Sequence, residues 1–216
     1  MKTAGAAIRD LVNFWLPQYR NQCGQWVHPA DETTFSRRRH SFNLDFPVSP
    51  FVGNVLGAPV VILGANAGYR SDVTPEEFPD QQAIDTYLER VRRPEAADWS
   101  VVARYYTGVN YGSAIETGRA VLVNACAYRS PKISSEPENR KVVEELASAK
   151  YTREWLLNAV LPLARVGGRL IVVKRPGLWN LPPNVRTSPG VVIDPAPISP
   201  QVTGMAWQAI REYLGS

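Results

Sequence analysis

The sequence predicts an α/β fold: a three-layer α/β/α sandwich around a central, mainly parallel sheet of four strands. Four short apolar runs, at residues 59–64, 120–124, 169–173 and 191–193, have the length and continuity of buried strands. Segments with helical periodicity separate these runs. Because strands that alternate with helices form right-handed crossovers onto a parallel sheet, we expect helices on both of its faces.

Periodicity and turn chemistry predict the elements of the first half. Residues 5–16 carry apolar side chains at helical spacing and predict a first helix, whereas residues 17–50 are polar and are expected to be irregular cover. Beyond the first strand, residues 81–92 place apolar side chains on one face of an amphipathic helix. Asp98 is a candidate cap for a further helix that reaches about Tyr106.

The second half continues the alternation. A Ser/Pro-rich loop at residues 130–137 follows the second strand. Helical patterns then run over residues 138–149 and 152–166, where Gly167 and Gly168 end the second helix. A last helix over about residues 202–214 follows the fourth strand and closes the chain.

Size and composition indicate one domain without a cofactor. The 216 residues suffice for one α/β core, so we expect a single domain, residues 1–216, with residues 1–50 as its cover. Two cysteines cannot supply a four-thiolate cluster or a disulfide framework, so we expect no metal and an intracellular setting. No apolar run approaches the ~20 residues of a membrane helix, and Arg9 and Asp10 interrupt any signal sequence. We therefore expect a cytoplasmic protein, monomeric and without a membrane partner.

Two polar segments directly follow predicted strands. Gly64–Tyr69 follows the first strand and Asp194–Gln201 follows the fourth. The loops at the carboxyl ends of parallel strands form the ligand crevice of such sheets. We therefore expect tight turns here and a site between them.

These segments resemble motifs of the uracil-DNA glycosylase superfamily. Gly64–Gly68 is similar to the first motif, most closely to its Gly-x-Asn-Pro-Gly form in the mismatch-specific and single-strand-selective branches. Asp194–Ser199, with Gly204 downstream, is similar to the second motif, His-Pro-Ser-Pro-Leu-Ser. Val121–Asn124 resembles the strand that ends in the base-reading asparagine. The ordered set covers the chain from about Phe51 to Gly204.

The resemblance implies a DNA glycosylase that flips a nucleotide out of the stack and hydrolyses its N-glycosidic bond by water attack. Asn66 would hold the water, Asn124 would read the edge of the base, and Asp194 would lie at the leaving-group side. From the residues alone, an unusual turn conformation is the alternative for Asn66, and the capping of a turn is the alternative for Asn124.

The remaining pocket and DNA contacts follow from the same resemblance. Gly64, Ala65 and Gly68 would line the base pocket, and Tyr69 or Phe78 would stack on the base, with core packing as the alternative for Phe78. Backbone and side-chain groups would grip phosphates, and an apolar residue would wedge into the duplex. The residues expected to contact DNA are Ser130, Lys132, Ser134, Ile198, Ser199 and Gln201.

The second motif departs from the family pattern. Asp194 replaces a histidine that stabilises negative charge on the departing base, and an ionised aspartate would repel that charge. It would help only as a proton donor with a raised pKa or by stabilising the sugar cation. Ala67 and Ala196 replace a proline and a serine, and the absence of lysine from both motifs argues against a Schiff-base lyase.

Three functions therefore compete. The first is a monofunctional, metal-free glycosylase of DNA repair that removes uracil or a related deaminated base; the second is a DNA-binding protein with this fold and little or no catalysis. The third is a small-molecule enzyme that binds a nucleotide or a free base. The net charge of +4 and the run Arg37–His40 favour a polyanion such as DNA, although a solvated loop explains that run as well.

Overall fold

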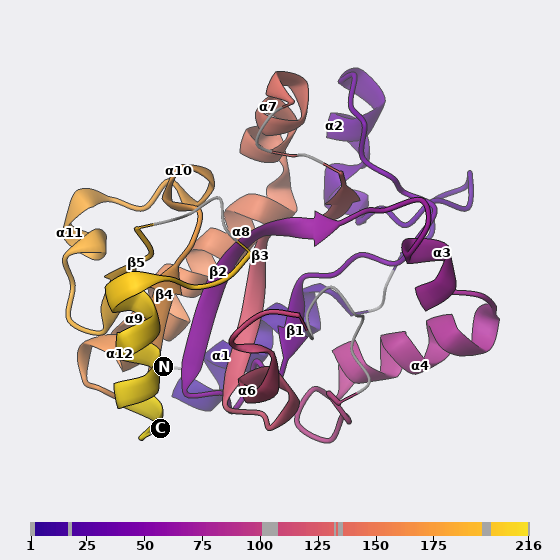
Figure 1. Ribbon diagram of the computed structural model, residues 1–216. Helices are drawn as coiled ribbons and strands as arrows, with labels where there is room; N and C mark the ends of the chain where they lie inside the picture. The colour runs from indigo at the N-terminus through magenta and orange to yellow at the C-terminus, as the bar shows by residue number, and fades with distance from the viewer. Residues whose placement is uncertain are drawn as a thin grey trace.

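A five-stranded sheet organises the fold (Figure 1). The computed structural model describes residues 3–16, 19–100, 108–131, 133, 136–195 and 200–215. Its strands are β1 (Phe51–Gly53), β2 (Val60–Gly68), β3 (Ala120–Ser130), β4 (Leu170–Val173) and β5 (Val191–Ile193). They lie in the order β1-β3-β2-β4-β5, with β2 to β5 parallel and β1 antiparallel to β3. The α/β class and the mainly parallel sheet are thus confirmed.

The prediction of four strands was wrong by one. The additional strand, β1, contains only two consecutive apolar residues, Phe51 and Val52, and it pairs along the outer edge of β3. Two strands are also longer than expected: β2 runs through Gly68 and β3 through Ser130. Residues 64–68 are therefore not a tight turn, because their backbone continues to pair with β3 across a register shift between Asn66 and Gly68.

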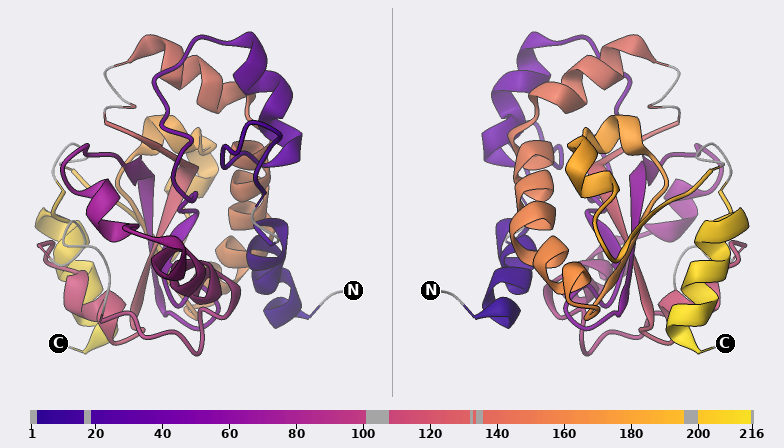
Figure 2. Two further views of the ribbon diagram at one scale, coloured as in Figure 1. Left: turned by 90° about the vertical axis from the view of Figure 1, so that its right-hand side faces the viewer. Right: turned by 90° about the vertical axis from the view of Figure 1, so that its left-hand side faces the viewer.

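Helices cover both faces of the sheet (Figure 2). One face carries α1, α8 and α9, and the other carries α6 and α12 (Figures 1 and 2). The helical elements in chain order are α1 (Ala4–Phe14), η1 (Pro29–Asp31), α2 (Glu32–Arg37), α3 (Thr74–Glu77), α4 (Gln81–Arg92), α6 (Gly112–Glu116), α7 (Pro137–Glu145), α8 (Ala147–Trp155), η2 (Leu156–Val160), α9 (Leu161–Arg165), α10 (Pro176–Trp179), α11 (Pro183–Arg186) and α12 (Gly204–Leu214).

Helices are found where the sequence predicted them in these segments, but several begin or end at other residues than expected. The helix over residues 81–92 is confirmed, whereas the helix expected at 138–149 breaks at Leu146 into α7 and α8. The helix expected at 152–166 is a continuation of α8 through the π-helical turn η2 into α9. Pro162 has no N–H to donate, which accounts for a change of hydrogen-bond register just before it. The helix expected beyond Asp98 falls largely on residues outside those described.

The N-terminal cover is more ordered than its composition predicted. It contains η1 and α2, and Asp31 is fully buried, where it accepts hydrogen bonds from Tyr128 Oη at 2.7 Å and Ser148 N at 3.1 Å. Trp155 Nε1 donates to the carbonyl of Ile8 at 3.0 Å. These buried bonds attach the first 50 residues to β3 and α8, so they share the core of the sheet.

Candidate functional site

One transverse row of the sheet brings four polar or small positions together. Gly64 on β2 pairs in register with Asn124 on β3. One residue before this pair, Leu63 pairs with Val173 and Val173 pairs with Ile193. Lys174 and Asp194, the next residues along the chain, therefore lie in the same row as Gly64 and Asn124. Backbone bonds from Lys174 N to Leu63 O (3.1 Å) and from Asp194 N to Val173 O (3.0 Å) continue these registers past the strand ends. We call Asn124, Gly64, Lys174 and Asp194 the sheet row.

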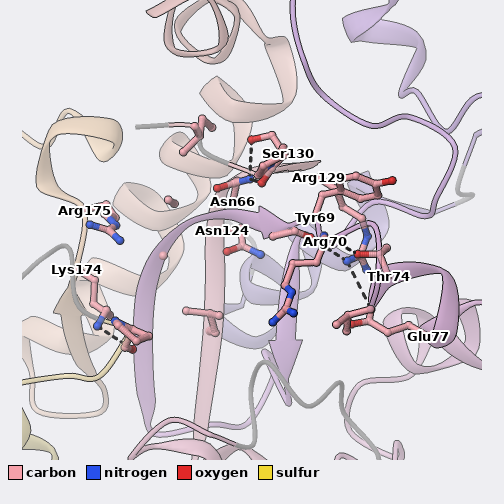
Figure 3. Close-up of a pocket in the computed structure, with 18 of the residues that line it drawn as sticks. Asn66, Tyr69, Arg70, Thr74, Glu77, Asn124, Arg129, Ser130, Lys174 and Arg175 are labelled. Carbon is pink, nitrogen blue, oxygen red and sulfur yellow. Dashed lines mark hydrogen bonds and ion pairs between the residues drawn. The ribbon is translucent and has the colours of Figure 1, made fainter. Parts of the chain in front are cut away.

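A cavity of about 350 Å³ opens over this row at the carboxyl edge of the sheet (Figure 3). Side chains from β2, α3, β3 and the segment after β4 surround it. The polar residues that line it are Asn66, Tyr69, Arg70, Thr74, Glu77, Tyr111, Asn124, Arg129, Ser130, Lys174 and Arg175. Among the described lining residues, four are cations and one is a carboxylate, so the cavity favours an anionic ligand or transition state.

Asn124 presents a fixed amide to the cavity. Its side chain is 2% exposed, and its Nδ2 donates to the carbonyl oxygen of Ser49 at 2.8 Å. A carbonyl can only accept a hydrogen bond, so the nitrogen must face Ser49. The oxygen, Oδ1, lies on the side of Gly64, 3.0 Å from where a Cβ on that glycine would be. The interpretation of Asn124 as a turn cap is therefore wrong, since β3 continues for six residues beyond it.

Asn66 lies two residues beyond Gly64, on the same face of β2. Its amide is also held by hydrogen bonds to backbone carbonyls. Nδ2 donates to the carbonyl oxygens of Ala67 (2.7 Å) and Ser130 (3.1 Å) and lies 3.1 Å from Ser130 Oγ. Since both carbonyls are acceptors, the Asn66 oxygen is turned away from them. Within the described part of the chain, Oδ1 accepts no hydrogen bond and is available to a water or ligand.

Gly64, Ala65 and Gly68 line the cavity. Packing favours glycine at position 64, because a Cβ there would lie 3.0 Å from both Asn124 Oδ1 and Leu122 Cδ1. A Cβ on Gly68 would meet no atom within 4 Å, so packing does not require glycine at that position.

The two candidate stacking residues differ in position. Tyr69 is half-buried and lines the cavity. Phe78 is buried outside it, where its ring packs against Phe46 and Tyr87 at centroid distances of 5.8 and 5.3 Å. The guanidinium of Arg129 covers Phe78 at 5.0 Å. The structure thus favours core packing for Phe78 and leaves Tyr69 as the candidate of the two that lines the cavity, which Tyr111 lines as well.

Asp194 is buried behind the cavity and does not line it. The residue is 1% exposed. Its carboxylate lies 3.4 Å from Lys174 Nζ and accepts a hydrogen bond from Thr203 Oγ1 at 2.8 Å. Lys174 is the member of this ion pair that lines the cavity. Burial lowers the pKa of Lys174, and the nearby Asp194 carboxylate opposes that shift. The sequence reasoning missed Lys174, although its place after an apolar strand marks it for the ligand edge.

A second charged pair on the opposite wall was also missed (Figure 3). Glu77 Oε2 lies 3.6 Å from Arg129 Nη1, and Arg129 in turn donates to the carbonyl oxygens of Pro47 and Gly68 at 3.0 and 3.3 Å. Burial raises the pKa of Glu77, and the neighbouring guanidinium opposes the rise. A carboxyl group with a raised pKa in a cavity is a recognised feature of functional sites.

The residues expected to contact DNA divide into two groups. Ser130 is 1% exposed and accepts a hydrogen bond from Asn66, so it holds that side chain in place and is too buried to contact DNA at the surface. Gln201 accepts from the backbone of Asn110 and donates to that of Gly108 at 2.9 Å, which attaches the last loop to the segment before α6. The others lie outside the residues that the structure describes: Lys132, Ser134, Ile198 and Ser199.

Within the described ranges, no three His, Cys, Asp or Glu side chains are grouped as a metal site would need. None of the helices described has the length and apolar character that crossing a membrane requires. Comparison of the chain with protein-family models, with curated proteins and with solved structures gave no match.

Proposed function

We propose that this protein hydrolyses the N-glycosidic bond of uracil, or of a related deaminated base, in DNA. One observation carries the proposal: two asparagine side chains, Asn66 and Asn124, reach one cavity from neighbouring strands with their amides oriented by backbone carbonyls. One amide suits the reading of a base, and the other suits the holding of a water. The cavity volume of about 350 Å³ is at the small end of ligand pockets and suits a single flipped nucleoside.

The orientation of Asn124 supports selection of uracil over cytosine. Uracil presents an N3–H donor beside the O4 acceptor, whereas cytosine presents an N3 acceptor beside an amino donor. The Asn124 oxygen can accept from N3–H, and its second N–H, the one not given to Ser49, can donate to O4. To bind cytosine, the amide would have to rotate by half a turn and would set its oxygen against the Ser49 carbonyl.

Asn66 is suited to orienting the nucleophile. Cleavage of a glycosidic bond passes through an oxocarbenium-like sugar, which needs only a weak nucleophile. The Asn66 oxygen can accept one hydrogen of a water molecule and so direct its lone pair at the anomeric carbon. No strong base is required, and an amide provides none.

Two features support DNA as the partner and catalysis as the outcome. Arg70 and Arg175 line opposite sides of the cavity, where they can meet the phosphates that flank a flipped nucleotide (Figure 3). The repulsion expected from Asp194 is weakened because that carboxylate is paired with Lys174 and does not line the cavity. This favours an active enzyme over a DNA-binding protein that has lost its chemistry.

The test is single-turnover excision from oligonucleotides that carry one uracil, hypoxanthine or xanthine, read as alkali-labile strand breaks. We expect excision by the wild type, and a rate lower by about 10²-fold or more in Asn66→Ala and in Asn124→Ala. The control is Asn184→Ala, which changes an exposed asparagine on α11 and should leave the rate unchanged. DNA binding without excision would favour the binding protein. Cleavage of free nucleosides with no salt-dependent DNA affinity would favour the small-molecule enzyme.

A further inference from the structure

Lys174 lies opposite Asn124 across the gap that Gly64 leaves in the sheet row. Adjacent strands are about 4.8 Å apart, so the two side chains start roughly 9.6 Å from each other, with only a glycine between them. Both line the cavity. A base read by Asn124 over Gly64 therefore has its opposite edge toward Lys174.

The amino group of Lys174 is held as an ammonium. Three oxygens surround Nζ: the carbonyls of Pro200 (3.1 Å) and Gln201, and the Asp194 carboxylate (3.4 Å). Two of these oxygens accept hydrogen bonds from Nζ, and the third belongs to the paired carboxylate, so the surroundings of Nζ favour its charged form. Because its hydrogen bonds are directed at the two carbonyls, the ammonium would act on a base in the cavity through its electric field.

The two charges of the ion pair are placed differently relative to the cavity. Asp194 directly follows the outer strand β5 and does not line the cavity, whereas Lys174 does. Thr203 Oγ1 donates to the far carboxylate oxygen at 2.8 Å and fixes the carboxylate on that side. The pair therefore turns its positive end to the cavity, in a buried setting where screening by water is weak.

We propose that Lys174 stabilises the negative charge that develops on the departing base, and that Asp194 is a positioning residue which holds the ammonium in place. This inference rests on the proposed function. In the step, the water oxygen bonds to C1′, the C1′–N1 bond breaks, and its electron pair leaves with the base as an anion. The proton of the water passes to solvent. The ammonium thus supplies the charge that the aspartate in the second motif lacks.

The experiment separates this role from mere support of the fold. Lys174→Met alone would leave the buried Asp194 carboxylate unpaired, so the comparison is made between Asp194→Asn and the double variant Lys174→Met/Asp194→Asn. Each is assayed by single-turnover excision of uracil and of 5-fluorouracil from the same oligonucleotide. Lys150→Met, an exposed position on α8, is the control for loss of a lysine.

We expect the double variant to excise uracil about 10²–10³-fold more slowly than Asp194→Asn, as for the loss of one oxyanion-stabilising group. The loss should be clearly smaller for 5-fluorouracil, because a more acidic base depends less on help as it leaves. An equal loss for both bases would assign Lys174 a structural role and overturn the inference. Unchanged rates would overturn it as well, while leaving the proposed function intact.

A second measurement needs no variant. Free uracil is titrated with pH in the presence of the wild-type protein, and its ionisation is followed by ultraviolet absorption. We expect the bound base to ionise at a lower pH than the free base; the absence of any shift would overturn the inference. If the wild type excises no base from DNA, the proposed function fails, and the inference fails with it.

Discussion

The substitution Gly64→Ala tests the assembly of the sheet row with the smallest possible change. The added methyl group would lie 3.0 Å from Asn124 Oδ1 and from Leu122 Cδ1, so these neighbours must move by a few tenths of an ångström. Gly64 is not among the residues with positive φ, so alanine is compatible with its backbone and gains about 0.4–1 kcal/mol from a less flexible unfolded chain. If the Asn124 amide rotates away, its bond to Ser49 is lost at a cost of about 1–3 kcal/mol.

The two contributions largely oppose each other. We expect a net loss of stability of about 0–2 kcal/mol, which lowers Tm by no more than roughly 8 °C for a chain of this size. Excision should nevertheless fall by about 10²-fold or more, because the methyl group narrows the gap between Asn124 and Lys174 and displaces a bound base.

The assay combines thermal unfolding with single-turnover excision. Gly5→Ala serves as control: it lies in α1, a Cβ there meets no atom within 4 Å, and alanine should raise stability by about 0.5–1 kcal/mol without affecting excision. Wild-type excision by a stably folded Gly64→Ala protein would refute the binding of the base over this glycine. Global unfolding of the variant would refute the account of its packing.

Two further predictions concern stability alone. Gly190→Ala should cost more than about 2 kcal/mol in urea unfolding, because Gly190 has φ +72° and a Cβ would lie 2.3 Å from the carbonyl oxygen of Ala164; a change below about 0.5 kcal/mol would contradict this. Burial lowers the pKa of His40 below its ordinary value of 6.5, so the folded state resists protonation and loses stability as pH falls through about 6.5. His40→Phe should remove that part of the loss and leave stability at neutral pH equal or higher, because Nδ1 is buried without a hydrogen-bond partner in the described structure. An unchanged acid response of unfolding between about pH 7.5 and 5.5 would contradict the assignment to His40.

The sheet could be predicted from the sequence because the parallel strands at its centre, β2, β3 and β4, are largely buried on both faces. Such strands appear as continuous apolar runs, and all four runs correspond to strands of the structure. The edge strand β1 was not predicted, since its apolar run is only Phe51 and Val52 and its pairing with β3 is a tertiary contact. The same limit applies to residues 64–68, whose composition favours a turn while pairing with β3 keeps them extended.

The candidate site was predictable where polar residues follow or end apolar runs of the sequence, as Asn66 and Asn124 do, although both residues lie inside longer strands of the structure. Their amide orientations were not, because these depend on carbonyl groups of Ser49 and Ser130, which the sequence does not relate to them. The importance of Lys174 depends on register: only the alignment of β4 with β2 and β5 puts its side chain between the cavity and Asp194. The place of Lys174 directly after the apolar run 169–173 marks it for the ligand edge, but the sequence does not show that it pairs with Asp194.

The sheet row has a consequence for how the protein acquires its site during folding. The row combines positions on β2 and β3 with positions directly after β4 and β5, and these are scattered between residues 64 and 194, so the row is complete only when all four strands are paired in register. A slip of one residue in any strand would turn its side chain to the opposite face. Long-range pairing of this kind forms slowly compared with local structure. The complete row should therefore form only after these strands have paired in register, and recovery of excision after refolding would report on correct strand alignment.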